Sequence, residues 1–318
     1  MGDPLGTSPL RWCVAIFSAR ETARTLASTL DAARAAVSTH PATIDLIVNG
    51  NARLAEALAA RVSRSGRGSA GVATRVWSLA LRDKAHAWNA YVHDIWPGAG
   101  SPCFMDGCIT VSAADLSALQ ARFEGSAQAM VAAAVPTAGR SAAAIRELML
   151  RNPQIHGSLY AVRDTAMAQM RAAGFRLPLG FYRSDSLLGT LVNFNFDPAT
   201  HEWDDRRIAV TREASWTMPL KSPWNPADVS AQLRRMTRQA VGRLEEAAIK
   251  ELFYDRRTSI DVLTPQPLGL VDEWQRRVPD SPNRPLMRSL LARVRMAHLR
   301  RRTDWRRSSE PPACLVES

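Results

Sequence analysis

The chain has 318 residues, of which 46% are hydrophobic, so it can bury a substantial core and is not disordered as a whole. No run approaches the roughly 18 consecutive apolar residues of a membrane-spanning helix, and residues 1–12 lack the apolar centre of a signal peptide. We therefore expect a cytoplasmic protein with one large domain or two small ones.

The net charge of +11 is concentrated near the C-terminus. Between Arg276 and Arg307 the chain has 11 arginines and only two acidic residues, Asp280 and Asp304, a local balance of +9. The rest of the chain then carries only +2. The basic character belongs to a tail, so we expect no specific nucleic acid as a partner of the folded domain.

The four cysteines contain no CxxC pair, and most of them stand in apolar or glycine-containing surroundings. Reduced thiols fit this pattern better than a disulfide framework or a zinc site. We expect Cys103 and Cys108 in particular to be packed thiols rather than metal ligands.

In chain order, apolar runs of strand type alternate with helical patterns up to residue 112. The predicted strands are WCVAIFS at 12–18, TIDLIVNGN at 43–51, VATRVWSLAL at 72–81 and PCFMD at 102–106. Helical patterns follow at 21–41, 52–62 and 83–98, and a Gly/Ser/Arg loop follows at 63–71. This alternation predicts a parallel sheet with helices on both faces, in which ligands bind beyond the carboxyl ends of the strands.

Beyond residue 112 the pattern becomes less regular. An alanine-rich stretch at 116–134 and the segments near 141–150 and 228–252 are predicted to be helical. We divide the chain into three segments, at 1–112, 113–252 and 253–318, the last of which is the basic C-terminal extension.

The basic extension contains a predicted amphipathic helix. One of its faces is apolar, with arginines on the others; the apolar residues are Leu286, Leu290, Leu291, Val294 and Ala297. Such a helix suits an anionic membrane surface, and a solvated, partly disordered tail is the alternative. Residues 308–318 are predicted to be unstructured.

Two polar turns, Asn49-Gly50 and Asp106-Gly107, lie at the carboxyl ends of predicted strands. A carboxylate at the end of a buried strand needs a cation, a donor or water, because an unpaired buried charge is costly. Asp-Gly is also a common turn, so Asp106 has both a functional and a purely structural interpretation.

Six landmarks occur in an order that resembles the family 2 glycosyltransferases, over about residues 12–252. They are VAIFSARE at 14–21, LIVNGN at 46–51, DKAHAWN at 83–89, FMDGC at 104–108, HGSLYAVR at 156–163 and LPLGFYRSDSLLG at 177–189. The resemblance implies the GT-A fold, a Rossmann-like, mostly parallel sheet in a single domain, here followed by the basic helical tail. It also implies that residues 1–112 form the nucleotide-sugar-binding half of this domain and residues 113–252 the acceptor-binding half.

This resemblance also implies an activity. It is the transfer of a sugar from a nucleotide-sugar donor to the hydroxyl of an unknown sugar, lipid or glycan acceptor, in cell-envelope, glycan or glycolipid biosynthesis. Inversion and assistance by a divalent cation, Mg²⁺ or Mn²⁺, are expected. By family position Asp106 is the metal ligand and Asp185 the catalytic base; a helix N-cap is the alternative role for Asp185.

The same comparison gives further positions for contact with the donor. Asn49, Lys84 and Asn89 are expected to face the nucleotide, and Arg235 resembles the arginine of the Gln-x-x-Arg-Trp motif that steadies the diphosphate. Met236 stands where this motif has tryptophan. His156 and Arg163 are candidates for the acceptor side, each with a structural role as the alternative.

The chain departs from the family pattern where the donor would bind. Cys108 replaces the second carboxylate of the Asp-x-Asp motif, and thiolate is a poor ligand for Mg²⁺. Arg20-Glu21 replaces Asn-Glu, and Ser184 replaces the glutamate before Asp185. The alternative function is therefore a catalytically degenerate GT-A-like binding protein that docks on membrane or nucleic acid through its basic tail. Peripheral attachment to the inner face of the membrane is consistent with either function.

Overall fold

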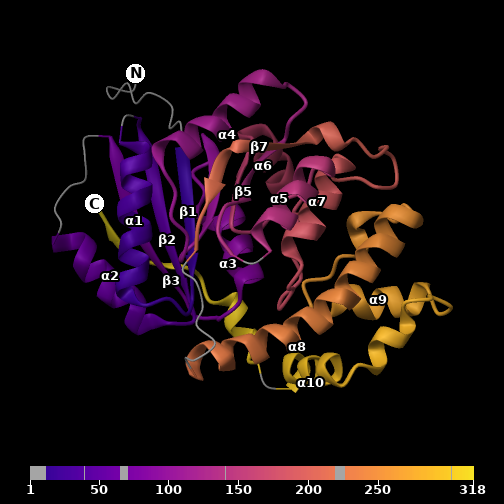
Figure 1. Cartoon of the computed structure of the whole chain (residues 1–318). Helices are drawn as coiled ribbons and strands as arrows, with labels where there is room; N and C mark the ends of the chain where they lie inside the picture. Colours follow the sequence, from indigo (N-terminus) through magenta and orange to yellow (C-terminus); the bar gives the residue numbers. More distant parts are fainter. Residues whose placement is uncertain (1–11, 39, 65–70, 140, 219–225, 302) are drawn as a thin grey trace, which may run out of the picture.

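A computed structural model describes residues 12–38, 40–64, 71–139, 141–218, 226–301 and 303–318. It confirms the α/β fold: one eight-stranded, mostly parallel sheet lies between helices on its two faces (Figure 1). Residues 1–11 and most of the loop predicted at 63–71 lie outside the described residues.

The strand order is β7-β5-β6-β4-β1-β2-β3-β8. The strands are β1 (Trp12–Ser18), β2 (Ala42–Asn49), β3 (Val72–Leu79), β4 (Ser101–Asp106), β5 (Val131–Pro136), β6 (Leu159–Val162), β7 (Ile208–Trp216) and β8 (Ala313–Glu317). Strands β4, β1, β2 and β3 are parallel, whereas β6 runs antiparallel to both β4 and β5, and β8 runs antiparallel to β3.

Two hydrophobic layers sandwich the sheet because successive strand residues point to opposite faces. On β1, Val14 and Ile16 pack with the layer under α1 (Ala23–Val37), α2 (Ala52–Arg64) and α4 (Ala113–Gly125). Ala15 and Phe17 pack on the opposite face. The helices on that side are α3 (Lys84–Ala90), α5 (Ala142–Arg151), α6 (Asp164–Ala172), α7 (Ser184–Asn193), α8 (Pro226–Ile249), α9 (Gly269–Arg277) and α10 (Leu290–Arg301).

The prediction of one helix over 116–134 is wrong in its second part. Helix α4 ends at Gly125, and VAAAVP forms β5, which is buried along its whole length between β6 and β7. Alanine favours helices, and a fully buried strand shows no alternation, so the pattern of this segment indicates a helix. The segment is nevertheless a strand, because β6 and β7 provide hydrogen-bond partners for the backbone on both sides of β5.

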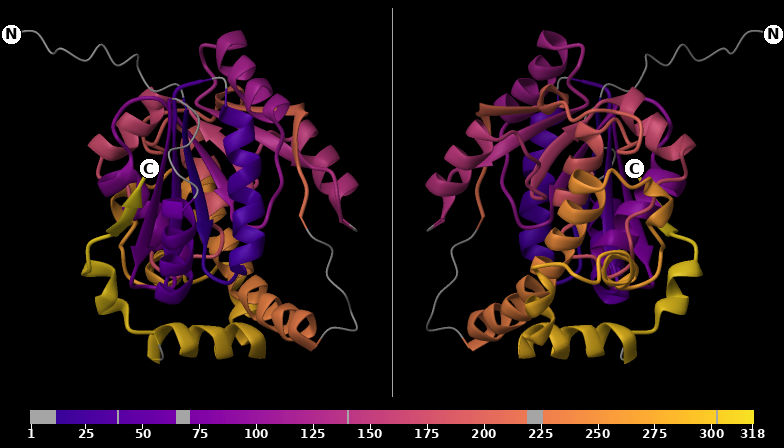
Figure 2. Two further views of the ribbon diagram at one scale, coloured as in Figure 1. Left: turned by 90° about the vertical axis from the view of Figure 1, so that its left-hand side faces the viewer. Right: turned by 90° about the vertical axis from the view of Figure 1, so that its right-hand side faces the viewer.

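The prediction that residues 308–318 are unstructured is also wrong. Strand β8 pairs with the edge strand β3, with Val76 opposite Val316 and Trp77 opposite Cys314. The C-terminal segment runs from α10 past the carboxyl ends of the strands to this edge (Figure 2). An edge strand exposes unpaired backbone groups, and β8 pairs with them on β3.

In the tail, the predicted amphipathic helix begins at Leu290 rather than before Leu286. Its buried side is formed by Ala292, Met296 and Leu299, and α10 packs against α8. Most of the predicted apolar face is exposed. No described helix has the length and apolarity needed to cross a membrane.

Candidate functional site

The turn after β4 fixes the position of Asp106. The Gly107 N–H donates a hydrogen bond to the Phe17 carbonyl oxygen at 2.8 Å, and the Asp106 N–H donates to the Ser158 carbonyl oxygen at 3.0 Å. A Cβ atom at position 107 would lie 2.9 Å from the Phe17 oxygen, too close for any residue except glycine. The Asp-Gly sequence therefore lets β4 end against β1 with its carboxylate at the carboxyl edge of the sheet.

Asp106 meets both a cation and a hydrogen-bond donor, two of the partners that suit a carboxylate at a strand end. Lys84 Nζ lies 2.5 Å from Asp106 Oδ1 and also donates to the Gly157 carbonyl oxygen at 2.9 Å. Ser158 Oγ donates to Asp106 Oδ2 at 3.0 Å. The Lys84 and Asp106 side chains remain 43% and 28% exposed, so the pair is open to solvent and to a ligand.

Helix α3 places Lys84 at its first residue. Asp83 caps this helix by accepting from the His86 N–H at 3.0 Å, and it also accepts from the Gly180 N–H at 3.1 Å. The cap therefore holds the start of α3 against the segment that leads to α7, where Asp185 lies.

Asp185 reaches the same place from the first turn of α7. Its Oδ2 accepts from the Gly157 N–H at 3.3 Å, and its Oδ1 accepts from the Ser186 N–H at 3.0 Å. A Cβ atom at Gly157 would lie 3.6 Å from Asp185 Oδ2 and 3.7 Å from Lys84 Nζ, so both side chains flank one space. The N-cap of α7 is Arg183, and Asp185 therefore does not have the capping role that was its alternative.

The electrostatics of this cluster keep a cation between two carboxylates. Burial alone would lower the pKa of Lys84, but Asp106 and then Asp185 outweigh it and raise this pKa above its ordinary value. His156, which lies against Trp216 at a ring distance of 4.9 Å, has its pKa lowered by burial, although both carboxylates oppose this change. The cluster thus pairs a protonated lysine with a histidine that tends to be neutral.

Two predicted residues are not brought into the cluster. Arg163 donates to the carbonyl oxygens of Phe123, Ser126 and Ala129, which ties the end of β6 to the end of α4 and the loop that follows it. Asn89 exchanges two hydrogen bonds of 2.8 Å with the backbone of Leu177.

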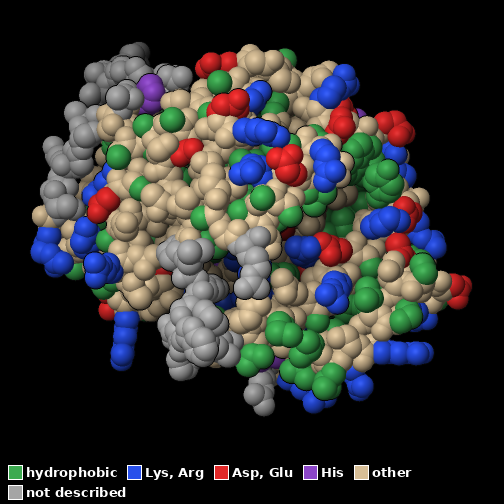
Figure 3. Space-filling model, viewed as in Figure 1, with side chains coloured by type: hydrophobic (Ala, Val, Ile, Leu, Met, Phe, Trp, Pro, Cys, Tyr) green, Lys and Arg blue, Asp and Glu red, His purple; other side chains and the backbone are tan. Residues whose placement is uncertain are grey.

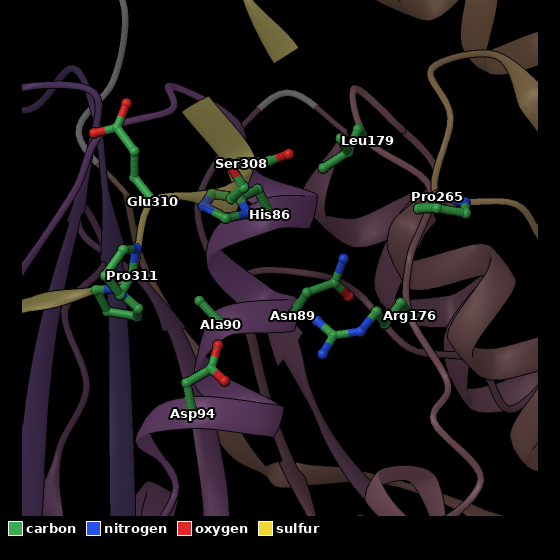
Figure 4. A pocket seen from close by; sticks show the side chains of 12 residues that line it. His86, Asn89, Ala90, Asp94, Arg176, Leu179, Pro265, Ser308, Glu310 and Pro311 are labelled. Atoms are coloured by element: carbon green, nitrogen blue, oxygen red, sulfur yellow. The ribbon is translucent and has the colours of Figure 1, made fainter. Parts of the chain in front are cut away.

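Asn89 lies on another face of α3 from Lys84. There it lines a cavity of about 410 Å³ together with His86, Asp94 and Arg176 (Figure 4). These contacts give Asn89 a structural role, and none of them supports its predicted contact with the nucleotide.

Asn49 ends β2 and is 4% exposed, with Leu79 opposite it on β3. Gly50 follows in the left-handed region, at φ +66°, and the backbone of Arg82 lies directly over it, so no side chain fits there. Arg82 also donates to the Ala19 carbonyl oxygen at 3.1 Å. The ends of β1, β2 and β3 are thus drawn together beside the Asp106 cluster.

Arginines gather over these strand ends, and we name them the arginine group: Arg20, Arg82, Arg234, Arg235 and Arg238. Burial and then repulsion by Arg238, Arg82 and Arg234 lower the pKa of Arg20. Burial and then repulsion by neighbours that include Arg235 and Arg234 lower the pKa of Arg238. Repulsion from Arg235 adds to burial in lowering the pKa of His156, so the arginine group extends to the Asp106 cluster.

Helix α8 positions the segment before Asp185 through a buried carboxyl group. Glu245 is 1% exposed and accepts from the backbone N–H groups of Tyr182 and Arg183 at 2.9–3.2 Å. Burial raises the pKa of Glu245 to about 7, although these hydrogen bonds and Arg183 oppose the shift. Because α7 begins directly after Arg183, Glu245 helps to set the place of Asp185.

Sequence reasoning missed Ser158, Glu245 and most of the arginine group. The signal for the arginines was present: Arg234, Arg235 and Arg238 share one side of a helix near Gln232, and Arg82 follows a predicted strand. Glu245 offered only a charged residue between Leu244 and a second glutamate, a pattern that many surface helices share.

Comparisons with known proteins show the fold. No protein-family model matches the sequence, and no curated protein shows a significant match. Among solved structures, the chain is similar to "Mannosyltransferase PcManGT from Pyrobaculum calidifontis in complex with GDP-Man and Mn2+". The match has a TM-score of 0.55 and 13% identity, and it covers 93% of this chain and 84% of the other. A glycosyltransferase-like fold is therefore shown, whereas membership of family 2 stays a prediction.

The buried Glu245 makes stability depend on pH. Between its ordinary pKa of 4.5 and about 7, the folded state keeps a proton that the unfolded state loses, so the free energy of unfolding falls as pH rises through this window. We expect a loss of about 3 kcal/mol relative to Glu245→Gln, which does not titrate. Urea unfolding at several pH values measures it, with Glu246→Gln as the neighbouring control. A Glu245→Gln curve parallel to that of the wild type would contradict this role.

Proposed function

We propose that this protein is an inverting glycosyltransferase that moves a sugar from a nucleotide-activated donor to an acceptor hydroxyl. The observation that carries the proposal is the meeting of Asp185 with the Lys84–Asp106 pair around Gly157, at the carboxyl edge of the sheet. Ligands bind at this edge in open α/β sheets. The solved structure of similar fold is a mannosyltransferase holding GDP-Man, which supports a nucleotide-sugar as the donor class.

The two sides of the cluster suit the two halves of the reaction. The acceptor oxygen attacks the anomeric carbon, the bond from that carbon to the phosphate oxygen breaks, and its electron pair leaves with the nucleoside diphosphate. Asp185 takes the acceptor proton as general base, a contribution on the order of 10²- to 10⁴-fold. Lys84 and the arginine group lie where negative charge on the diphosphate would need cations.

The divalent cation expected at Asp106 does not fit the donor set of this chain. Both Asp106 oxygens already accept hydrogen bonds, from Lys84 and Ser158, and Cys108 replaces the second carboxylate. Across the described ranges, no three His, Cys, Asp or Glu side chains form a group that could hold a metal ion. We therefore assign no step of the proposed reaction to a metal, although the similar mannosyltransferase is described with Mn²⁺.

Binding of the leaving group tests the proposal. UDP, GDP and TDP are added in turn, and thermal unfolding is followed with and without each nucleotide. The matching nucleotide is expected to stabilise the fold by about 2.7 kcal/mol at a hundredfold excess over its dissociation constant. Release of the same nucleotide from its sugar conjugate, with a screen of acceptors, then identifies the reaction. Absence of any shift would favour the catalytically degenerate binding protein.

Replacement of the proposed base separates chemistry from binding. Asp185→Asn is expected to lower turnover by about 10²-fold or more, because the amide cannot take a proton, while the nucleotide still binds. Asp164→Asn is the matched control, since Asp164 also lies in the first turn of a helix and accepts from the following N–H, at 2.7 Å. Full turnover in Asp185→Asn would remove Asp185 as the base.

We also propose that the exposed face of α10 docks on an anionic membrane. Leu290, Leu291 and Val294 are 72%, 40% and 54% exposed on one side of this helix. Exposed Arg288 and Arg293 lie beside them in sequence, and apolar and basic side chains gather at this lower edge of the molecule, over α8 and α10 (Figure 3). Apolar residues flanked by arginines complement a bilayer with acidic lipids, where each arginine contributes about 1 kcal/mol.

Sedimentation with lipid vesicles tests this surface. The wild type is expected to sediment with vesicles that contain phosphatidylglycerol and to stay unbound with phosphatidylcholine alone. Val294→Glu should abolish sedimentation, because it places a negative charge in the apolar face. Leu148→Glu is the matched control, since Leu148 is an exposed leucine (43%) on α5. Equal sedimentation of the two variants would contradict docking through α10.

A further inference from the structure

The ammonium group of Lys84 stands close to where a metal-ligating Asp-x-Asp motif would act. Lys84 Nζ is 2.5 Å from Asp106, the aspartate of the FMDGC segment, and its second bond is to the Gly157 carbonyl oxygen. The helix start that carries it is fixed by the Asp83 cap. A cation is thus built into the chain at this point, held by two acceptors and 43% exposed.

The arginine group gives the neighbouring surface more positive charge than its own acidic residues balance. Glu21 is the nearby carboxylate on the β1 side, and its Oε2 accepts from Ser18 Oγ and from the backbone of Ala19 and Arg20. These bonds fold the loop that presents Arg20. Carboxylates therefore offset only part of the repulsion among Arg20, Arg82 and Arg234. A bound anion of high charge would relieve this repulsion.

We propose that Lys84 and the arginine group together replace the divalent cation, so that this protein binds a nucleoside diphosphate and stabilises its departure without metal. This inference rests on the proposed glycosyl transfer and names the groups that neutralise its leaving group. When the bond between the anomeric carbon and the phosphate oxygen breaks, the electron pair stays on the diphosphate. Lys84 and the arginines hydrogen-bond that oxygen and its neighbours without giving up a proton, and Asp185 holds the proton of the acceptor.

The protonation state of Lys84 agrees with this role. Asp106 and Asp185 raise the pKa of the lysine, so it keeps its charge at neutral pH without a ligand. Guanidinium groups suit phosphate oxygens because they present several donors in one plane. Such fixed cations need no reorganisation when charge develops, which is the condition for strong electrostatic stabilisation.

The experiment measures binding of UDP, GDP and TDP to the full chain by calorimetry, in excess EDTA and again in Mn²⁺. The nucleotide that binds is expected to do so with the same affinity in both. Lys84→Met should weaken nucleotide binding in EDTA at least tenfold, which is about 1.4 kcal/mol, and added Mn²⁺ should not restore the affinity. Lys250→Met is the matched control, because Lys250 is an exposed lysine that forms an ion pair with Asp255.

A second, independent variant is designed to make nucleotide binding depend on metal. Cys108→Asp restores the second carboxylate of the motif, and its nucleotide binding is expected to become stronger in Mn²⁺ than in EDTA, unlike that of the wild type. Lys84→Arg, which keeps the charge, should retain more affinity than Lys84→Met, so a loss caused by misfolding is recognised.

The outcomes separate this inference from the proposed function. Wild-type binding that EDTA abolishes and Mn²⁺ restores would overturn the metal-free site and leave the transferase proposal standing. Equal binding by Lys84→Met and the wild type would also overturn the role of Lys84. If none of the three nucleotides binds in either medium, the proposed function itself fails, and this inference fails with it.

Discussion

An ammonium group and a carboxylate meet at the end of β4, and much of the surrounding chain is arranged to keep them together. Gly107 allows Asp106 to lie against β1, and the Asp83 cap fixes the helix start that carries Lys84. Such a partly exposed pair contributes little to stability, on the order of 1 kcal/mol or less. Its importance lies in position, because the Gly157 backbone links the same lysine to Asp185.

The first four strands could be predicted from the sequence because each is a continuous apolar run that ends in a turn signal. The convergence of Asp106 and Asp185 could also be anticipated, although no local pattern connects residues that are so distant in the chain. This prediction rested on the order of six landmarks in the sequence, each of which is a weak signal on its own. The structure places Lys84, Asp106 and Asp185 together as that order implied, whereas their chemical roles stay proposals.

The errors share a physical origin, since they concern segments whose structure depends on neighbours. The alanine run in β5 favours a helix until β6 and β7 supply partners, and β8 is a strand only because β3 offers an edge. Asn89 matched a family position, yet its amide is engaged by the backbone of Leu177, a contact that sequence spacing does not reveal. The arginine group likewise exists only after α8 is laid across the ends of β1 and β3.

Helix α8 connects two parts of this surface, to which the proposed reaction gives different roles. Its first half carries Arg234, Arg235 and Arg238, and its second half carries Glu245, which holds the backbone of Tyr182 and Arg183. A helix moves largely as a rigid rod, so a shift of its arginines toward an anion would be transmitted to the segment that leads to Asp185. In the proposed transfer, an anion bound by these arginines would therefore reposition the segment before Asp185, and the two substrates would bind in a preferred sequence.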